Sequence, residues 1–391
     1  MASFDFDTVL DRRHTHSLKW DQTETMFGLR DVIPMWVADM DFAAPPAVVN
    51  AVTRRAAHGA YGYASTPESF WQSVIGWFRD RHRWEVERSW LARAPGVVPA
   101  VSLCVNAFTR PGDGIIVQTP VYYPFFRAVE DNGRRLLRNP LVVEGGRYRM
   151  DLDGLDRLVD ADTRMLILCS PHNPVGRVWT REELERLGEL CERRNLTVLS
   201  DEIHMDLTLG GRRHVPFASI SPALADRTIS CVAPSKTFNL ASLCMSIVVA
   251  SNASLLARYQ AQFEAAGLII GSLFGTVALE AAYRTGAPWL DALLSYLEGN
   301  VEFAERFISG RLPRIAFVRP EGTYLALLDC RGLGLPQKEL DDFFLRKAGV
   351  YFDSGPWFGD ELQGFERINL ACPRKTLTEA LERIERAVNA S

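Results

Sequence analysis

Five short apolar runs lie between Arg93 and Ala250, and none of them alternates with polar residues. Such runs are typical of strands buried on both faces, as in a parallel sheet that is covered by helices. The runs are GIIVQT, MLILCS, LTVLS, TISCVA and SIVVA. They predict an α/β fold built on a doubly wound, mostly parallel sheet.

A helix is predicted between MLILCS and LTVLS. Thr180 and Glu183 have the spacing of a capping box at its start. One apolar stripe follows at helical spacing, formed by Leu184, Leu187, Leu190 and Cys191. Strands and helices therefore alternate here, as the α/β fold requires.

The pattern changes after a long helical region from Ala253 to Ser309. RIAFV, TYLALLD and ERINLA are predicted strands around the helix QKELDDFFLRKAG, and a closing helix starts near Thr376. These elements predict a smaller α+β domain. We expect a large domain over 51–288, a small C-terminal domain over 289–391, and an N-terminal segment, 1–50, that joins the small domain.

Composition excludes several classes of protein. A formal net charge of −4 argues against a nucleic-acid surface. No apolar run is long enough to span a membrane, and the first residues lack the apolar stretch of a signal peptide. The seven cysteines form no Cys-x-x-Cys pair and lie mostly in apolar runs, which favours reduced thiols and a cytoplasmic protein.

Polar stretches follow the predicted strands: GVVPA, TPVYYPF, SPHNPVG, SDEIH and APSKTFN. Ligands of open α/β sheets bind outside the carboxyl ends of the strands. Because these ends meet at one edge of a parallel sheet, we expect the five stretches to share a binding site.

The stretch SDEIHMDL brings Asp201, Glu202, His204 and Asp206 within six positions, which raises the question of a metal site. Alternation along a strand separates Asp201 from the other three side chains, and no helical His-x-x-x-His pair is present. We therefore predict no metal. A lone buried carboxylate at a strand tip needs a cationic partner, and the protonated pyridine nitrogen of pyridoxal phosphate would supply one.

Lysine is scarce in this chain, since only five of the 44 basic residues are lysines. Lys236 stands between Ser235 and Thr237 directly after a predicted buried strand. A desolvated lysine at this position is suited to form a Schiff base with a carbonyl. Without the neighbouring motifs, the simpler interpretation is an ordinary lysine in a surface loop.

Other side chains of these stretches suit the same cofactor. Asn173 and His204 are placed to donate hydrogen bonds to its phenolate oxygen, and Tyr122 to stack on its ring. The first amides of the helix that follows PGVVPA are placed to hold its phosphate. Each feature has a simpler interpretation when taken alone: a turn, core packing, or an ordinary helix start.

Taken together, the motifs resemble the fold-type I pyridoxal-phosphate enzymes of the class I/II aminotransferase superfamily. More narrowly, the chain is similar to the cystathionine β-lyase, or cysteine C–S lyase, branch. The resemblance covers nearly the whole chain and is carried by SLKWD, IPMWVADMDF, YGY, PVYYPFF, CSPHNPVGRVW, SDEIHMD, SKTFNLA, EGTYLALLD, WFG and RINLACPR.

The resemblance implies a role for each matching residue. Lys236 would be the Schiff-base lysine and the base that removes the α-proton of the substrate. Asp201 would pair with the pyridine nitrogen, Asn173 and His204 would face the phenolate, and Tyr122 would stack on the ring. The phosphate would be held by the Val97 and Val98 amides and Ser235, helped by Tyr61 or Tyr63 of a second subunit in a homodimer with shared active sites. Arg367 would bind the α-carboxylate of a small amino-acid substrate, while Glu202 and Asp206 would be structural.

The chain departs from the family pattern in two places. Ala241, Ser242 and Leu243 stand where Ala-Gly-Leu is usual, and Cys244 stands where many members carry a phosphate-binding arginine, eight residues after the lysine. The stretch AAGLIIGSLFG is also unusually apolar, and we expect it to mark a changed substrate pocket.

The predicted function is β-elimination from cystathionine or another S-substituted L-cysteine, which yields a thiol, pyruvate and ammonia. An aminotransferase, or another reaction through an α-carbanion, is the alternative, because both begin with the same proton abstraction. A binding or regulatory protein without turnover is a third reading, which intact Lys236, Asp201, Asn173 and Arg367 oppose. The sequence does not name the substituent on sulfur.

Overall fold

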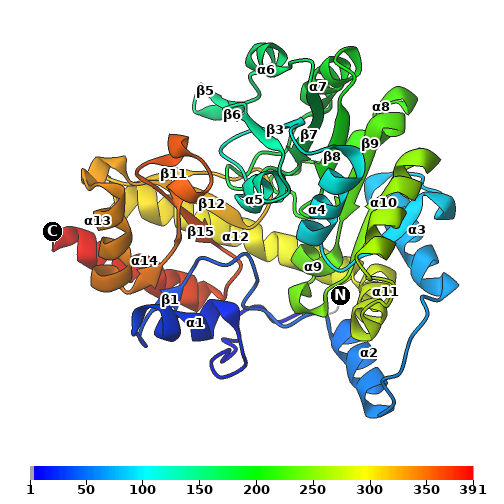
Figure 1. Cartoon of the computed structure of the whole chain (residues 1–391). Coiled ribbons are helices and arrows are strands. Elements are labelled where there is room, and N and C mark those ends of the chain that lie inside the picture. The colour runs from blue at the N-terminus through cyan, green and yellow to red at the C-terminus, as the bar shows by residue number, and fades with distance from the viewer. Residues whose placement is uncertain (1–3, 391) are drawn as a thin grey trace.

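A seven-stranded sheet forms the centre of the larger part of the molecule (Figure 1), in a computed structural model that describes residues 4–390. The strand order is β2-β10-β9-β8-β7-β3-β4. In that order the strands are Leu91–Ala94, Ser246–Val249, Thr228–Val232, Thr197–Asp201, Thr163–Cys169, Gly114–Val117 and Arg135–Arg138. β10 runs antiparallel to both neighbours, and the other adjacent pairs are parallel. The sheet is therefore mostly parallel, as the sequence predicts.

Both faces of this sheet are covered, which explains why its strands lack polar alternation. Ile115 and Val117 of β3 belong to one apolar cluster, whereas Ile116 belongs to another on the opposite face. The first face packs against α4 (Val97–Phe108), α5 (Pro124–Glu130) and α10 (Ala253–Ala265). The second packs against α6 (Leu152–Leu158), α7 (Arg181–Arg193) and α8 (Pro222–Arg227).

The predicted helix between β7 and β8 is α7, and its capping box is present. The Thr180 side chain accepts from the Glu183 backbone N–H, and the Glu183 side chain accepts from the Thr180 backbone N–H. The four predicted stripe residues, Leu184, Leu187, Leu190 and Cys191, are all buried.

A four-stranded antiparallel sheet, ordered β11-β12-β15-β14, forms the smaller part. Its strands are Ala316–Val318, Leu325–Asp329, Phe365–Asn369 and Asp353–Ser354. The longer helices here are α1 (Leu18–Phe27), α13 (Gln337–Asp342), a π-helix (Phe343–Ala348) and α14 (Arg374–Asn389). The N-terminal β1 (Ile33–Pro34) pairs in parallel with β13 (Val350–Tyr351), so segments from both ends of the chain lie together in this part.

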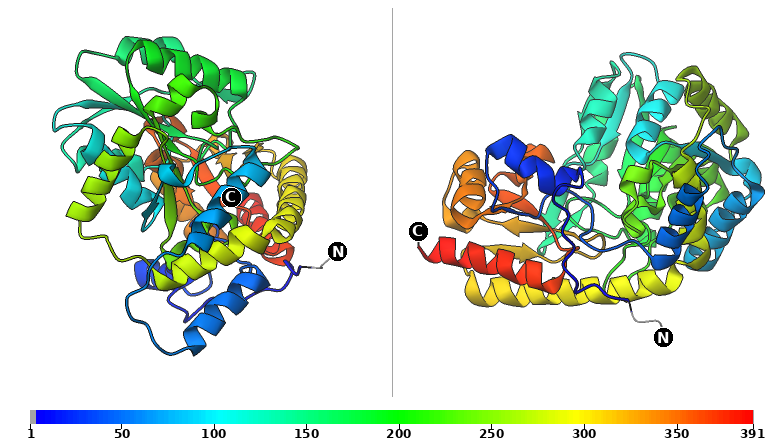
Figure 2. Two further views of the ribbon diagram at one scale, coloured as in Figure 1. Left: turned by 90° about the vertical axis from the view of Figure 1, so that its right-hand side faces the viewer. Right: turned by 90° about the horizontal axis from the view of Figure 1, so that it is seen from below.

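Helix α12 (Ala287–Arg311) runs lengthwise along the molecule and contacts both parts (Figure 2). It begins beside α11 (Leu273–Thr285) and reaches α14 and β11. With α2 (Pro46–Ala57) and α3 (Glu68–His82), it contributes to an apolar cluster that extends through both parts. The proposed boundary between residues 288 and 289 falls at the start of this helix and remains a prediction.

Four strands lack a clear signal in the sequence. β2 and the edge strand β4 read LARA and RLLR, and their arginines hide the apolar character expected of a strand. β5 (Val142–Glu144) and β6 (Arg147–Arg149) form a separate, largely exposed hairpin. Among residues 4–390, no helix combines the length and apolar character needed to cross a bilayer.

Candidate active site

Three polar stretches lie side by side because the strands that precede them are adjacent in the sheet. Cys169 at the end of β7 pairs with Asp201 at the end of β8, and Asp201 pairs with Cys231 near the end of β9. SPHNPVG, SDEIH and APSKTFN therefore leave the sheet at the same edge. β3 is the other neighbour of β7, and the chain that follows β3 reaches Tyr122 at this same edge.

A cavity of about 200 Å³ opens at that edge. Most of the predicted site residues line it: Val97, Val98, Tyr122, Asn173, Asp201, His204, Ser235 and Lys236. The rest of the wall comes from Ala38, Gly96, Pro99, Cys169, Ile203, Ala241, Cys244 and Met245. All five predicted stretches thus contribute to one cavity, and the N-terminal segment adds Ala38 to its wall.

Lys236 lies in the short helix α9 (Pro234–Thr237), directly after β9. Its Nζ donates a hydrogen bond to the Ala38 carbonyl at 2.6 Å. Burial, followed by the nearby positive charge of Arg367, lowers the pKa of Lys236 to about 8. A substantial fraction of this amine is therefore neutral near physiological pH, which is the form that attacks a carbonyl.

Asp201 is buried at the tip of β8, and one of its carboxylate oxygens accepts from the Ile203 backbone N–H at 3.0 Å. Burial raises its pKa to about 7, although the Ile203 hydrogen bond acts in the opposite direction. Within residues 4–390 no cationic side chain forms an ion pair with it. The site therefore holds a carboxylate that a cationic ligand group would stabilise in its charged form.

His204 lies in the same cavity as Asp201, and here the alternation argument was wrong. It grouped His204 with Glu202 and Asp206, away from Asp201, but β8 ends at Asp201 and the chain then turns. Burial holds the pKa of His204 well below its usual value, so the ring is neutral. Its Nδ1 is buried without a hydrogen-bond partner.

Glu202 and Asp206 have hydrogen-bond partners within the protein. Glu202 accepts from the Phe217 N–H and the Ser230 hydroxyl and lies 2.8 Å from His214 Nε2. Asp206 accepts from Trp77 Nε1 and Thr237 Oγ1, and it lies 2.7 Å from His82 Nε2. These contacts fit the structural role expected of both acids. In the part of the chain that the structure describes, no group of three or more His, Cys, Asp or Glu side chains is arranged to hold a metal.

Arg367 is buried behind the cavity wall rather than in it. One guanidinium nitrogen donates to Asn173 Oδ1 at 3.0 Å, and the other donates to the Trp36 carbonyl at 3.1 Å. The second nitrogen also forms an ion pair with Asp353, and the guanidinium lies over the Phe358 ring. Nε has no hydrogen-bond partner. Asn173 thus connects Arg367 to the cavity.

Asp353 is a site residue that the sequence did not indicate. It lies on β14, opposite Arg367 in the small sheet, and burial raises its pKa. The sequence contains no motif that marks it, because an aspartate in FDSGPW resembles any turn residue. Only the register of β14 against β15 places it at the guanidinium.

The start of α4 forms the other end of the cavity. Its N-cap, Gly96, offers no side-chain hydrogen bond, so the first amides, including those of Val97 and Val98, remain available to an anion. Ser235 and Cys244 line the same cavity. Among the described residues of its wall, Lys236 is the only cationic side chain, so Cys244 leaves this end of the cavity without the arginine common in the family.

Tyr61 and Tyr63 do not line the cavity of their own chain. These residues are 59% and 92% exposed, and the Tyr61 hydroxyl donates to the Ala56 carbonyl at 2.6 Å. The apolar stretch 265–275 is also absent from the cavity wall, and Ile269 and Ile270 are 64% and 61% exposed. The expected link between this stretch and a substrate pocket therefore finds no support within one chain.

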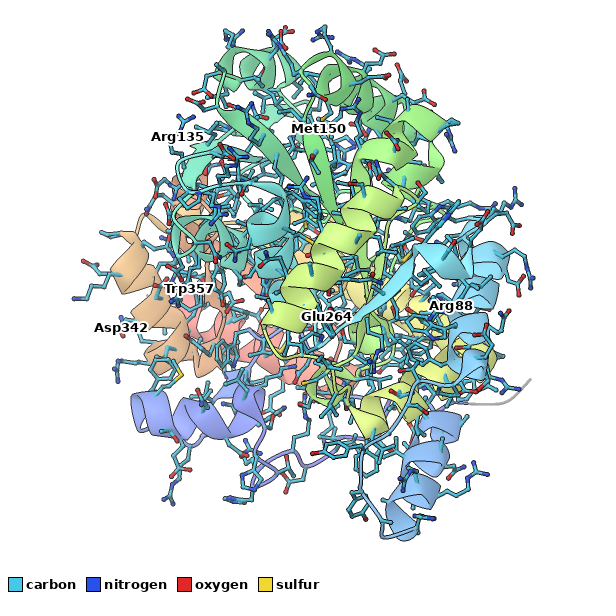
Figure 3. The ribbon with its side chains drawn as sticks, turned by 45° about the vertical axis from the view of Figure 1, so that its right-hand side comes forward. Arg88, Arg135, Met150, Glu264, Asp342 and Trp357 are labelled. Carbon is cyan, nitrogen blue, oxygen red and sulfur yellow. The ribbon has the colours of Figure 1, made fainter. Side chains whose placement is uncertain are left out.

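The two parts of the molecule meet beside this site. Trp357 lies between them at the surface (Figure 3), and its ring contacts that of Tyr123 at a centroid distance of 6.0 Å. Tyr123 also contacts Phe358, the residue beneath Arg367. Aromatic packing thus joins the small sheet to the edge of the large one.

Comparison with known proteins agrees with this geometry. The model of the family described as aminotransferase class I and II matches residues 30–384. Cystathionine beta-lyase PatB of Bacillus subtilis is 44% identical over 98% of this chain and 100% of its own. The crystal structure of cystalysin from Treponema denticola, which contains a pyridoxal 5'-phosphate cofactor, has a TM-score of 0.96 and 37% identity, with full coverage of both chains.

A third relative, the pyridoxal-phosphate-bound C–S lyase of Staphylococcus hominis, has a TM-score of 0.92 and 31% identity over 99% of this chain and 98% of its own. The chain belongs to the class I/II aminotransferase family and has the fold-type I architecture. The resemblance inferred from the motifs is confirmed.

The lowered pKa of Lys236 predicts how cofactor capture depends on pH. Only the neutral amine attacks an aldehyde, so the rate at which the apoprotein captures pyridoxal phosphate should rise through about pH 8 and then level off. Stopped-flow absorbance between pH 6 and pH 10.5 would measure it. A rate that continues to rise up to pH 10 would show that Lys236 has the pKa of an ordinary lysine.

Asp201→Asn should weaken cofactor binding by about two orders of magnitude or more, because loss of one partner of a buried ion pair costs roughly 3–5 kcal/mol.

Without cofactor, the same variant should melt at a higher temperature than wild type at pH 8. The reason is that the folded-state pKa of Asp201 lies above its unfolded value, so ionisation destabilises the folded state as pH rises toward about 7.

The melting difference should shrink at pH 5, where the folded protein keeps Asp201 protonated. Glu202→Gln is the matched control: it disturbs the contacts to His214, Ser230 and Phe217, and should lower the melting temperature with little change in cofactor affinity. Equal losses of cofactor affinity in the two variants would contradict the separate roles of these acids.

Proposed function

We propose that this protein is a pyridoxal-phosphate-dependent C–S β-lyase that cleaves cystathionine or another S-substituted L-cysteine. The observation that carries the proposal is the pair formed by a lysine of lowered pKa and a buried carboxylate of raised pKa in one cavity. The named activities of PatB and of the Staphylococcus hominis enzyme support the choice of reaction.

The residues present fit the cofactor. Asp201 lacks a cationic partner, and a protonated pyridine nitrogen would provide one. Asn173 and neutral His204 would hold the ring oxygen, and half-buried Tyr122 would cover the ring. The Val97 and Val98 amides with Ser235 would hold the phosphate. When bound, pyridoxal phosphate supplies an electron sink for the negative charge that develops at Cα of an amino acid.

Lys236 has two tasks in this proposal: it binds the cofactor covalently, and its neutral amine then takes the proton from the substrate Cα. Arg367 orients the substrate by binding its α-carboxylate. Its Nε is a buried donor without a partner, and Asn173 joins its guanidinium to the cavity wall. This arrangement would point the α-proton at Lys236, which is a contribution of positioning.

Elimination follows from the substrate itself, because a thiolate at Cβ is a good leaving group. The Cα–H bond breaks, a Cα–Cβ double bond forms, and the electron pair of the Cβ–S bond leaves with sulfur. Water then replaces nitrogen in the released three-carbon fragment. The sum is one S-substituted cysteine and one water giving one thiol, one pyruvate and one ammonia.

The proposed active unit is a homodimer. Tyr61, Tyr63, Ile269 and Ile270 form exposed aromatic and apolar surface, which in a soluble protein marks an interaction site. A second copy that covers this surface would bring Tyr61 or Tyr63 to the phosphate end of the cavity, which has no arginine of its own. The cytoplasm is the proposed location, since none of the seven cysteines is paired.

The reaction is tested by incubating the holoenzyme with L-cystathionine and a series of S-alkyl cysteines. Thiol and pyruvate should appear in equal amounts and faster than any added 2-oxo acid is aminated. Conversion of the cofactor to its amine form, with release of a 2-oxo acid that retains sulfur, would identify an aminotransferase instead.

Complementation tests the dimer. A Lys236→Ala chain mixed with a Tyr61→Ala/Tyr63→Ala chain should recover about a quarter of wild-type activity, because half of randomly mixed dimers are heterodimers with one intact site. Each variant alone should be strongly impaired. A wild-type protein that is fully active as a monomer in analytical ultracentrifugation would refute the shared site.

A further inference from the structure

Lys19 is a second unusual lysine, and the proposed reaction does not account for it. It lies on α1, in the motif SLKWD, and its side chain is 0% exposed. Nζ donates to Asp41 Oδ2 at 2.8 Å and to the Asp39 carbonyl at 3.4 Å, and lies 3.7 Å from Asp39 Oδ1. A compact ammonium with three donors matches these three acceptors better than a planar guanidinium would.

The two aspartates belong to residues 36–42, WVADMDF, which we call the strap. Arg12 donates to both carboxylates, at 2.7 Å to each, and Trp20 Nε1 donates to Asp41 at 2.8 Å. Two cations from the N-terminal segment thus hold the two acids of the strap. Burying so many charges costs free energy. A requirement for one defined geometry of the strap would explain why they are present.

Side chains from the rest of the site hold the strap from its other sides. Asn369 donates to the Val37 and Asp39 carbonyls at 2.7 and 2.6 Å. Asn239, three residues after Lys236, accepts from the Met40 N–H and donates to the Met40 and Phe42 carbonyls. Side chains from other elements of the site therefore hold four carbonyls of the strap, those of Val37, Asp39, Met40 and Phe42.

At the centre of the strap is Ala38, whose carbonyl accepts hydrogen bonds from Lys236 Nζ at 2.6 Å and the Tyr324 hydroxyl at 2.8 Å. Ala38 also lines the cavity. The carbonyl is therefore the acceptor for the amine of Lys236 whenever that amine is free, both before it captures the cofactor and after the substrate releases it.

We propose that Lys19 is a positioning residue: by holding Asp39 and Asp41 it fixes the strap so that the Ala38 carbonyl orients the free amine of Lys236. The inference rests on the proposed role of Lys236. Neither SLKWD nor WVADMDF contributes a catalytic group. This role would explain the presence of both motifs, since together they position the amine of Lys236. The amine is held near the position where it captures the cofactor and receives the α-proton, and small displacements there reduce rates strongly.

The test separates positioning from stability. Lys19→Met leaves Asp41 with Arg12 as its one remaining ion-pair partner and should lower the melting temperature. Lys19→Met/Asp41→Asn removes both charges of the pair and should recover most of that stability. Both variants should nevertheless capture pyridoxal phosphate about tenfold more slowly than wild type, measured by stopped-flow absorbance of the apoproteins. Lys338→Met, at an exposed lysine of the small domain, is the control and should match wild type.

Turnover gives a second readout. Arg367 also contacts the strap, through the Trp36 carbonyl, but keeps its contacts to Asn173 and Asp353 in the double variant. The fall in kcat should therefore exceed any rise in KM, and the kinetic isotope effect with α-deuterated substrate should increase. A double variant that captures the cofactor at the wild-type rate would overturn the role of Lys19. A wild-type apoprotein that captures no cofactor, or a Lys236→Ala variant that captures it normally, would overturn the proposed function itself.

Discussion

The charge balance around Lys236 and Asp201 is the constraint on which the rest of the site depends. Both side chains are placed where burial works against their ionised forms, which brings the two pKa values to about 8 and about 7. A protein that only had to be stable would gain by replacing them with apolar groups. Their presence in one cavity is explained by a ligand that supplies a carbonyl for one and a cation for the other.

The large sheet creates this pair through its register. β8 and β9 are parallel neighbours, and their pairing places Asp201 opposite Cys231, five residues before Lys236. In the small sheet, the register of β15 against β14 places Arg367 opposite Asp353. Asn173 accepts a hydrogen bond from Arg367 and so joins the two parts of the molecule. Residues far apart in the sequence thus converge through strands that end at a common edge of the large sheet and through strand register in the small one.

Much of this arrangement could be predicted from the sequence. Apolar runs without alternation identify doubly covered strands, and a parallel sheet brings the residues that follow them together. The prediction failed where the backbone leaves regular structure. Strand alternation separated His204 from Asp201, although the family resemblance placed both at the cofactor. Both line one cavity because β8 ends at Asp201, after which side chains no longer alternate. Asp353 and the carbonyl of Ala38 were missed because strand register and backbone atoms leave no signature in residue types.

The proposed reaction depends on covalent binding of the cofactor by Lys236. The most direct measurement is to load the protein with pyridoxal phosphate, reduce it with borohydride, digest it and locate the pyridoxyl group by mass spectrometry. One label per chain is expected, on the peptide that contains Ser235, Lys236 and Thr237. A label on buried Lys19 or on any other lysine, or no stable label, would contradict it.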